Sequence, residues 1–344
     1  MTTVRDVAKL AGVAPITVSR VVNNFPGVSQ YTRERVNKAI ADLNYVPNAM
    51  AKSLRSKQTC TIALVLTDIT NPFWTTIARG VEDTAAEKGY HVIFCNTDED
   101  PEKEANYINI LLQRRVDGLI IAPSTDDGRY LLSLKRNDIP CVLIDRRVSG
   151  FNADVIRSDG KEGARLLTQH LINLGHRWIA MLAGPSKVFT SRDRLAGYLE
   201  ALQKNGISID DNLIKEGMYD EDGGFKFTKE LLSSVPCPTA IVAANLSIAI
   251  GALRALREAG LRVPEDVGLV CIDDLPQASL ICPFLTVWAQ RPYTIGVAAA
   301  ELLLDRMISK TRRHKSREII IDADLIIRKS CGNELAGISD QIQR

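Results

Sequence analysis

From residue 61 onward, short apolar runs alternate with longer amphipathic stretches, and this alternation limits the possible folds more than any other feature. The apolar runs are TIALVL (61–66), HVIFCN, GLIIAP, CVLID, WIAMLAG, AIVAAN, VGLVCID and FLTVWAQ. The amphipathic stretches are 73–88, 102–114, 161–174, 193–204, 224–233, 247–259 and 293–308. Continuous apolar strands that alternate with helices predict parallel sheets covered by helices on both faces.

The series is too long for one open sheet, and its natural break lies near 154–160. The body is therefore predicted to be α/β, with two doubly wound parallel-sheet lobes. In such sheets a ligand lies outside the carboxyl ends of the strands, which predicts a site in the cleft between the lobes.

Polar side chains end several of the apolar runs, where an open sheet presents its ligand. Asp145, Asp273, Asn245 and Gln290 end CVLID, VGLVCID, AIVAAN and FLTVWAQ. A carboxylate there can accept hydrogen bonds from paired hydroxyl groups. The structural alternative is that an aspartate at a strand end caps a helix.

The first 58 residues differ in charge from the rest of the chain. They hold nine lysines and arginines against three acidic residues, whereas the whole chain has a net charge of only +2. A basic module thus precedes a mildly acidic body. Such a module is attracted to phosphates through the release of condensed counterions.

Three short helices are predicted in this basic module. Thr3 caps the first, over Val4 to Ala11, with Val7, Ala8, Leu10 and Ala11 facing a core, and Gly12-Val13 makes a tight turn. Pro15 begins the second, and the third runs from Ser29, as its cap, through Leu43. The second helix leaves Ile16, Thr17, Ser19, Arg20 and Asn23 on its outer side. Three helices with this turn predict an all-α helix-turn-helix unit.

The stretches DVAKLAGVAPITVSRVVNN, TRERV and LNYVPNAMAKSLR resemble the headpiece of the LacI/GalR family of bacterial regulators. The resemblance implies that the second helix enters the DNA major groove, with base-edge contacts from Pro15, Ile16 and Arg20 and phosphate contacts from Thr17, Ser19 and Asn23. Arg20 is the best direct reader, because a guanidinium can bind guanine O6 and N7 together. Pro15 and Ile16 depart from the commoner small polar residues and can offer only apolar contacts.

Residues 48–56 form a short helical segment that is marginal alone in water. In the family, the corresponding helices of two protomers pair in the minor groove, where a leucine at the position of Leu54 kinks the DNA. Arg55 lies beside it and is predicted to contact the same DNA. The alternative is that Leu54 packs onto the body.

The resemblance continues through DITNPFW, RRVDGLIIAP, RDRLAGY and IDDLP, and it implies the fold of periplasmic sugar-binding proteins, with three crossings between lobes. Domains are predicted at 1–46 (helix-turn-helix), 47–58 (hinge helix and linker), 59–334 (effector binding and dimerisation) and 335–344 (tail).

In the family, an arginine at the position of Arg194 reaches the ligand; the alternative is pairing with Asp193 or Glu200. Phe73, Trp74 and Tyr219 could form an apolar platform for a sugar ring, although Phe73 and Trp74 could instead lie at a subunit interface. The predicted effector residues are Phe73, Trp74, Asp145, Thr190, Arg194, Tyr219, Asn245, Asp273 and Gln290.

The sequence lacks a G-x-S-x-G elbow, a phosphate loop, a G-x-G-x-x-G run and an H-E-x-x-H pair, so we predict no enzyme and no cofactor. No apolar run reaches the roughly 18 residues of a membrane span, and a cytoplasmic protein is expected. The scattered cysteines predict reduced core residues. We expect a homodimeric repressor that binds a palindromic operator in double-stranded DNA. Two aspartates, Arg194 and the neighbouring Arg146 and Arg147 favour a sugar or sugar acid as the effector. The alternatives are a nucleobase-responsive regulator and a sugar-binding protein that does not bind DNA.

Overall fold

The computed structural model describes residues 2–46, 58–274, 284–308 and 315–332. The chain divides into two compact units, Met1–Thr59 and Cys60–Arg344. The predicted hinge segment, with Leu54 and Arg55, and the predicted tail lie outside the described residues. Within those residues, no helix is long and apolar enough to cross a membrane.

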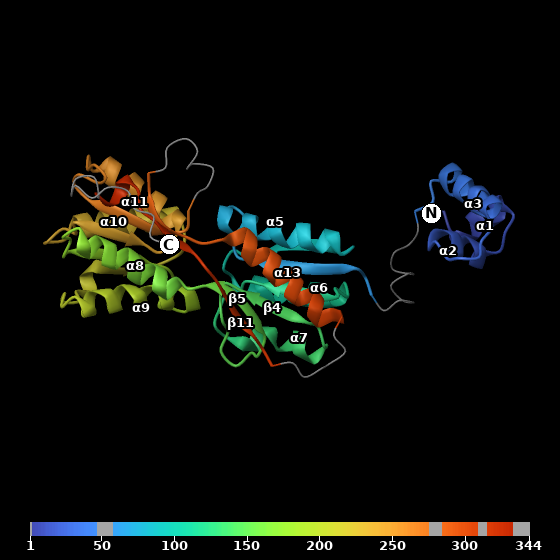
Figure 1. The fold of residues 1–344 in the computed structure, drawn as a ribbon, viewed down its shortest axis with the longest axis horizontal. Helices are drawn as coiled ribbons and strands as arrows, with labels where there is room; N and C mark the ends of the chain where they lie inside the picture. The colour runs from blue at the N-terminus through green and yellow to red at the C-terminus, as the bar shows by residue number, and fades with distance from the viewer. Residues whose placement is uncertain (1, 47–57, 275–283, 309–314, 333–344) are drawn as a thin grey trace. The chain divides into compact units, whose positions relative to one another are not determined.

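The described residues 2–46 of the N-terminal unit form three helices, α1 (Val4–Ala11), α2 (Pro15–Val22) and α3 (Gln30–Asp42) (Figure 1). Thr3 and Asp6 form a reciprocal capping box at the start of α1, and Ser29 caps α3 through the Thr32 amide. Gly12 ends α1 in the left-handed region with φ 63°, which glycine adopts without steric cost. These local signals confirm the predicted helices.

The core of this unit is made of small apolar side chains. Val7, Val18 and Val36, one from each helix, are fully buried against one another. The expectation for Leu10 was wrong, because its side chain is 54% exposed. Val7, Ala8 and Ala11 already complete the inward stripe of this two-turn helix, so Leu10 lies beyond its edge.

The first lobe of the body contains a six-stranded, fully parallel sheet in the order β11-β5-β4-β3-β1-β2. Its strands are β1 (Thr61–Leu66), β2 (His91–Asn96), β3 (Gly118–Ile121), β4 (Cys141–Ile144), β5 (Asp154–Ser158) and β11 (Glu318–Ile321). Its helices are α5 (Pro72–Glu87), α6 (Pro101–Gln113), η1 (Gly128–Leu131), α7 (Leu132–Arg136) and α13 (Pro292–Ile308). A Cβ on Gly296 of α13 would lie 2.2 Å from the Ile77 carbonyl oxygen of α5, so glycine permits this close helix contact.

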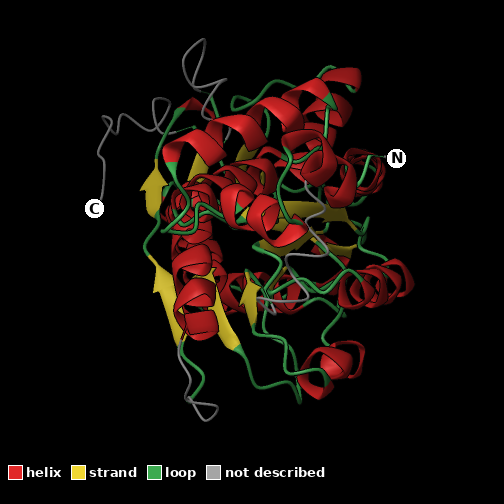
Figure 2. Ribbon diagram, turned by 90° about the vertical axis from the view of Figure 1, so that its right-hand side faces the viewer, coloured by secondary structure: helices red, strands yellow, loops and turns green. Residues whose placement is uncertain are grey.

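The second lobe also contains a six-stranded sheet, in the strand order β12-β10-β9-β8-β6-β7. Its strands are β6 (Ile179–Ala183), β7 (Ile214–Glu216), β8 (Ala240–Ala243), β9 (Gly268–Ile272), β10 (Thr286–Ala289) and β12 (Asp324–Ile326). Its helices are α8 (Gly160–Asn173), α9 (Phe189–Lys204), η2 (Asp211–Leu213), α10 (Glu221–Leu232), α11 (Leu246–Glu258) and η3 (Lys329–Cys331). Helices lie on both sides of the strands (Figure 2). The sheet departs from the fully parallel expectation at one edge, where β12 runs antiparallel to β10.

In the part of the chain that the structure describes, three crossings join the lobes, after β5, after β10 and after β11. The expected two-lobed α/β fold is confirmed. The strand β12 matches the terminal strand near 322–328 that the family resemblance implied. Three other short strands, β5, β7 and β11, were not predicted, because their sequences DVIRS, IKE and EIII carry charges. The expectation of core cysteines was wrong for Cys60 and Cys237, which are exposed in loops, whereas Cys95, Cys271 and Cys331 are buried.

Candidate functional site

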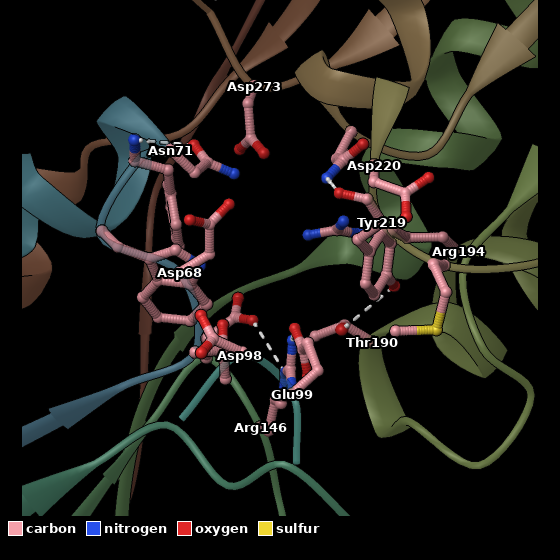
Figure 3. Close-up of a pocket in the computed structure, with 16 residues that line it drawn as sticks. Asp68, Asn71, Asp98, Glu99, Arg146, Thr190, Arg194, Tyr219, Asp220 and Asp273 are labelled. Atoms are coloured by element: carbon pink, nitrogen blue, oxygen red, sulfur yellow. Dashed lines mark hydrogen bonds and ion pairs between the residues drawn. The ribbon is translucent and has the colours of Figure 1, made fainter. Parts of the chain in front are cut away.

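A cavity of about 190 Å³ lies in the second unit, where the carboxyl ends of both sheets meet (Figure 3). The first lobe contributes loops that follow β1, β2 and β4 together with the start of α5, and the second contributes loops that follow β7, β8 and β9 and the start of α9. The lining residues are Thr67, Asp68, Asn71, Phe73, Trp74, Asp98, Glu99, Asp145, Arg146, Thr190, Arg194, Met218, Tyr219, Asp220, Asn245 and Asp273.

The structure brings most of the residues predicted from the sequence into this cavity. Those that line it are Phe73, Trp74, Asp145, Thr190, Arg194, Tyr219, Asn245 and Asp273. Gln290 stands behind the lining, where its side-chain amide donates a hydrogen bond to the Asp273 carboxylate. It therefore holds a lining residue in place.

The two aspartates at strand ends share an unusual backbone conformation. Asp145 has φ 63° and Asp273 has φ 80°, and both are only 5% exposed. A left-handed non-glycine residue costs about 1 kcal/mol or more, and such residues gather at binding sites where the surrounding fold holds them. The fold thus presents both carboxylates to the cavity at a conformational cost.

Arg194 points away from the acidic residues of its own helix. Asp193 lies 3.7 Å from Arg157, and Glu200 pairs with Lys161 and Lys204. The Nη1 atom of Arg194 donates to the Ala244 carbonyl at 2.6 Å, while its buried Nε finds no hydrogen-bond partner among the described residues. A buried N–H without a partner is costly, and a ligand oxygen would satisfy it.

Aromatic rings flank the polar groups. Phe73 and Trp74 are buried and meet edge to face, with ring centroids 4.9 Å apart. The Tyr219 ring lies 5.8 Å from the Arg194 guanidinium, and its hydroxyl lies 3.4 Å from the Thr190 hydroxyl. These rings give the cavity apolar walls on both lobes, as suits the faces of a sugar ring.

Asn245, which lines the cavity, also has a structural role. Its side-chain oxygen accepts from the Ile248 amide and so caps α11, while its side-chain nitrogen donates to the Tyr219 carbonyl at 3.4 Å. It joins two segments of the second-lobe wall.

Seven further residues line the cavity that were not predicted from the sequence: Thr67, Asp68, Asn71, Asp98, Glu99, Met218 and Asp220. The signal was present for several of them, because Thr67 and Asp68 follow β1 directly, just as Asp145 follows β4. Arg147, which was thought to add positive charge near the ligand, pairs with Glu318 instead and is not among the lining residues.

The outer side of α2 presents the predicted DNA-contacting residues. Pro15, Arg20 and Asn23 are exposed, Ile16 is 49% exposed, and Thr17 and Ser19 are half-buried. The Asn23 side-chain amide donates to the Ser19 backbone carbonyl at 2.7 Å, so two of the three residues assigned to phosphates also stabilise the end of α2.

Both parts of the chain match models of known families. Residues 3–48 match the model of bacterial regulatory proteins of the lacI family, and residues 59–329 match that of periplasmic binding proteins and the sugar binding domain of the LacI family. The HTH-type transcriptional repressor PurR of Photobacterium profundum is 34% identical over 331 residues, covering 96% of this chain and 98% of that protein. The ribose operon repressor of Escherichia coli (strain K12) is 35% identical over 320 residues, covering 93% and 97%. Both relatives are repressors, in agreement with the prediction that the chain is not an enzyme.

Solved structures agree with this assignment. A lac repressor dimer bound to operator and the anti-inducer ONPF matches with a TM-score of 0.82 and 31% identity, covering 96% of this chain and 99% of that one. A LacI family transcriptional regulator from Enterococcus faecium with bound ribose matches with a TM-score of 0.68 and 32% identity, covering 78% and 98%. The chain therefore belongs to the LacI family of bacterial regulatory proteins.

Proposed function

We propose that this chain is a repressor that binds a palindromic operator as a homodimer, and that a sugar bound between its lobes sets its operator affinity. One observation carries the proposal: a basic three-helix unit and a cavity with converging carboxylate and guanidinium groups occur in the same chain. A sugar suits this cavity because Asp145 and Asp273 can accept from its hydroxyls, Arg194 can donate to its oxygens, and the aromatic rings can cover its faces.

The control of DNA binding would follow from motion of the lobes. A ligand that contacts both lobes favours a particular lobe arrangement, and hinge motion at the three crossings can change the spacing of the two DNA-binding units. The coupling is reciprocal, so a ligand that weakens operator binding is itself bound less tightly by the operator complex.

The open edge of the first-lobe sheet supports the homodimer. β2 forms this edge, and its Ile93 and Phe94 side chains are 38% and 48% exposed. An exposed apolar edge strand is avoided in proteins unless another surface covers it. A second copy of the chain would cover it and give the two-fold symmetry that a palindromic operator requires.

Phe94→Glu is expected to raise the dimer dissociation constant about 30-fold or more, because dimerisation would bury a carboxylate in place of an aromatic ring. Sedimentation velocity over a range of protein concentrations measures the change. Ile209→Glu, at a comparably exposed apolar residue outside the named helices and strands, is the matched control and should leave the dimer intact. An unchanged dimer in Phe94→Glu would exclude this edge as the interface.

Asp273 should make sugar binding depend on pH. Burial, opposed by Arg194, raises the pKa of Asp273 to about 6. A sugar hydroxyl donates to the ionised form, so sugar affinity should fall up to about tenfold for each pH unit below 6 and stay level above it. The folded pKa lies above the unfolded value, so this group alone lowers the free energy of unfolding as the pH rises from about 4 to 6. Calorimetric titration with sugar from pH 5 to 8 measures the change in affinity, and Asp273→Asn is the variant whose sugar affinity should no longer depend on pH.

The proposal as a whole is tested by titrating the full-length protein onto DNA from its own promoter region. Fluorescence anisotropy is recorded with and without a panel of sugars, sugar acids and nucleobases. Tight, salt-dependent binding to a palindromic site that a sugar alters supports the proposal, and the direction of the change separates induction from co-repression. A response to a nucleobase alone would replace the sugar, and the lack of any site-specific binding would leave a sugar-binding protein that does not bind DNA.

A further inference from the structure

Arg146 places a second guanidinium in the pocket, next to Asp145. Its side chain is only 4% exposed, and it lies between two rings, with centroids 5.9 Å away for Trp74 and 6.0 Å away for Tyr219. An unpaired arginine in such a position would attract an anionic ligand, because guanidinium groups bind carboxylates and phosphates through two parallel hydrogen bonds.

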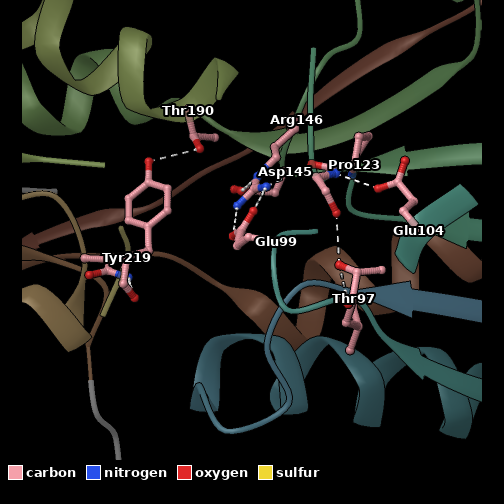
Figure 4. Close-up of polar contacts among 11 residues, drawn as sticks. Thr97, Glu99, Glu104, Pro123, Asp145, Arg146, Thr190 and Tyr219 are labelled. Atoms are coloured by element: carbon pink, nitrogen blue, oxygen red, sulfur yellow. Dashed lines mark hydrogen bonds and ion pairs between the residues drawn. The ribbon is translucent and has the colours of Figure 1, made fainter. Parts of the chain in front are cut away.

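Glu99 occupies that binding face of Arg146 (Figure 4). The two carboxylate oxygens of Glu99 accept from Nη1 and Nη2 of Arg146, both at 2.6 Å. Nη1 also donates to the Pro123 carbonyl at 2.8 Å. The Glu99 side chain is itself only 12% exposed, so the pair is shielded from water and its attraction is strong.

The loop that carries Glu99 has a strained backbone at the residue that contacts Arg146 and at the residue before it. Asp98 and Glu99 are consecutive residues in the left-handed region, with φ 55° and 58°, between the end of β2 at Asn96 and the Asp100 cap of α6. Neither is glycine, so the backbone is strained at both positions. A strained turn of this kind marks a position that the surrounding fold holds, and here it places the Glu99 carboxylate against Arg146.

The remaining charges of the pocket favour a neutral ligand. Besides Glu99, the lining carries Asp68, Asp98, Asp145, Asp220 and Asp273, and Lys103 offsets only Asp98. The described lining residues include two cations, Arg146 and Arg194. Arg146 is hydrogen-bonded to Glu99, whereas Arg194 donates to a backbone carbonyl and not to a carboxylate. The like charge of these carboxylates opposes an anion that enters the pocket.

We propose that the Glu99–Arg146 pair determines the charge selectivity of the pocket, so that it binds neutral sugars and rejects the corresponding sugar acids. The inference rests on the proposed function, because it assumes a sugar in this cavity. Glu99 is a specificity residue that acts through Arg146: removing its charge exposes a buried guanidinium to the ligand.

The test compares matched pairs of probes that keep the same sugar ring and differ in charge at C6: D-glucose with D-glucuronate, D-galactose with D-galacturonate, and D-mannose with D-mannuronate. Calorimetric titration of the full-length protein at constant ionic strength gives the affinity ratio within each pair. The wild-type protein should bind a neutral member and prefer it to its acid by at least about 100-fold, since a like-charge contact opposes the acid. Glu99→Gln should shift that ratio toward the acid by at least about tenfold.

Two further variants separate selectivity from folding. Glu102→Gln removes an exposed carboxylate from the first turn of α6, outside the pocket lining, and should leave the ratio unchanged. Glu99→Asp keeps the charge and should retain the preference for neutral sugars even if both affinities fall. An unchanged ratio in a Glu99→Gln protein that still binds sugar, or a wild-type protein that prefers an acid, would overturn the inference. If no probe binds and a nucleobase does, the sugar of the proposed function is wrong and the selectivity inference falls with it.

Discussion

Arg194→Ala is expected to weaken sugar binding by about 10² to 10³-fold, or about 3 to 4 kcal/mol. Arg194 is 5% exposed and lies where it lowers the pKa of Asp273. Its removal leaves the buried Asp273 carboxylate without this cation and takes away the N–H group that is free to meet a ligand oxygen. Calorimetric titration with the sugar found in the operator screen measures the loss.

Two variants on the same residue and helix make this result specific. Arg194→Lys keeps a charge but not the planar fork, so it should recover only part of the affinity. Lys204→Ala, at the exposed end of α9, should bind sugar like the wild-type protein. Operator binding without sugar should persist in all three. Near-normal sugar affinity in a folded Arg194→Ala protein would move the ligand away from this cavity.

Arg20→Ala is expected to lower specific operator affinity by about 10² to 10³-fold in the dimer. Each protomer would lose a base-edge contact worth about 1 to 3 kcal/mol, and a palindrome engages two of them. Arg20 is exposed on α2 next to the exposed Ile16 and Asn23, so the loss should not disturb the packing of the three helices. Anisotropy titrations with the operator and with a scrambled duplex of equal length measure both affinities.

The control for this change removes the same charge from another helix. Lys38→Ala on α3 should reduce binding to both duplexes about equally, because a phosphate or general electrostatic contact carries no base information. If Arg20→Ala also weakened both duplexes equally, Arg20 would be a phosphate contact and the base-edge assignment would be wrong.

The local parts of this protein could be predicted from its sequence because their causes lie within a few residues. Thr3, Gly12 and Ser29 delimit the N-terminal helices through caps and a turn that involve near neighbours. The apolar runs mark the central strands, since a strand buried on both faces must be continuously apolar. The rule that ligands meet the carboxyl ends of parallel strands then led to Asp145 and Asp273, and the same rule applied to β1 would have led to Asp68.

The missed elements depend on partners that are distant in sequence. β5 contains Arg157, and a charged residue does not predict a buried strand. In the fold, the buried Arg157 guanidinium pairs with Glu318 of β11, 161 residues later in the sequence. Leu10 has the apolar character of a core residue, but it is 54% exposed, while Val7, Ala8 and Ala11 of the same helix are buried. Residue type alone gives neither outcome, because both depend on which surfaces meet after folding.

For the charge of the pocket, too, part was predictable from the sequence and part was decided by the tertiary structure. The sequence predicted the two-lobed fold and the strand-end aspartates, since periodicity and strand ends are local properties, and the family resemblance added the order of the domains and the role of Arg194. The sequence presented Arg146 as a free cation beside Asp145 and so left sugar acids open. Only the folded chain brings Glu99, 47 residues earlier, to within 2.6 Å of that guanidinium in a site shielded from water. Electrostatic interactions depend on distance and burial, and both are properties of the tertiary structure.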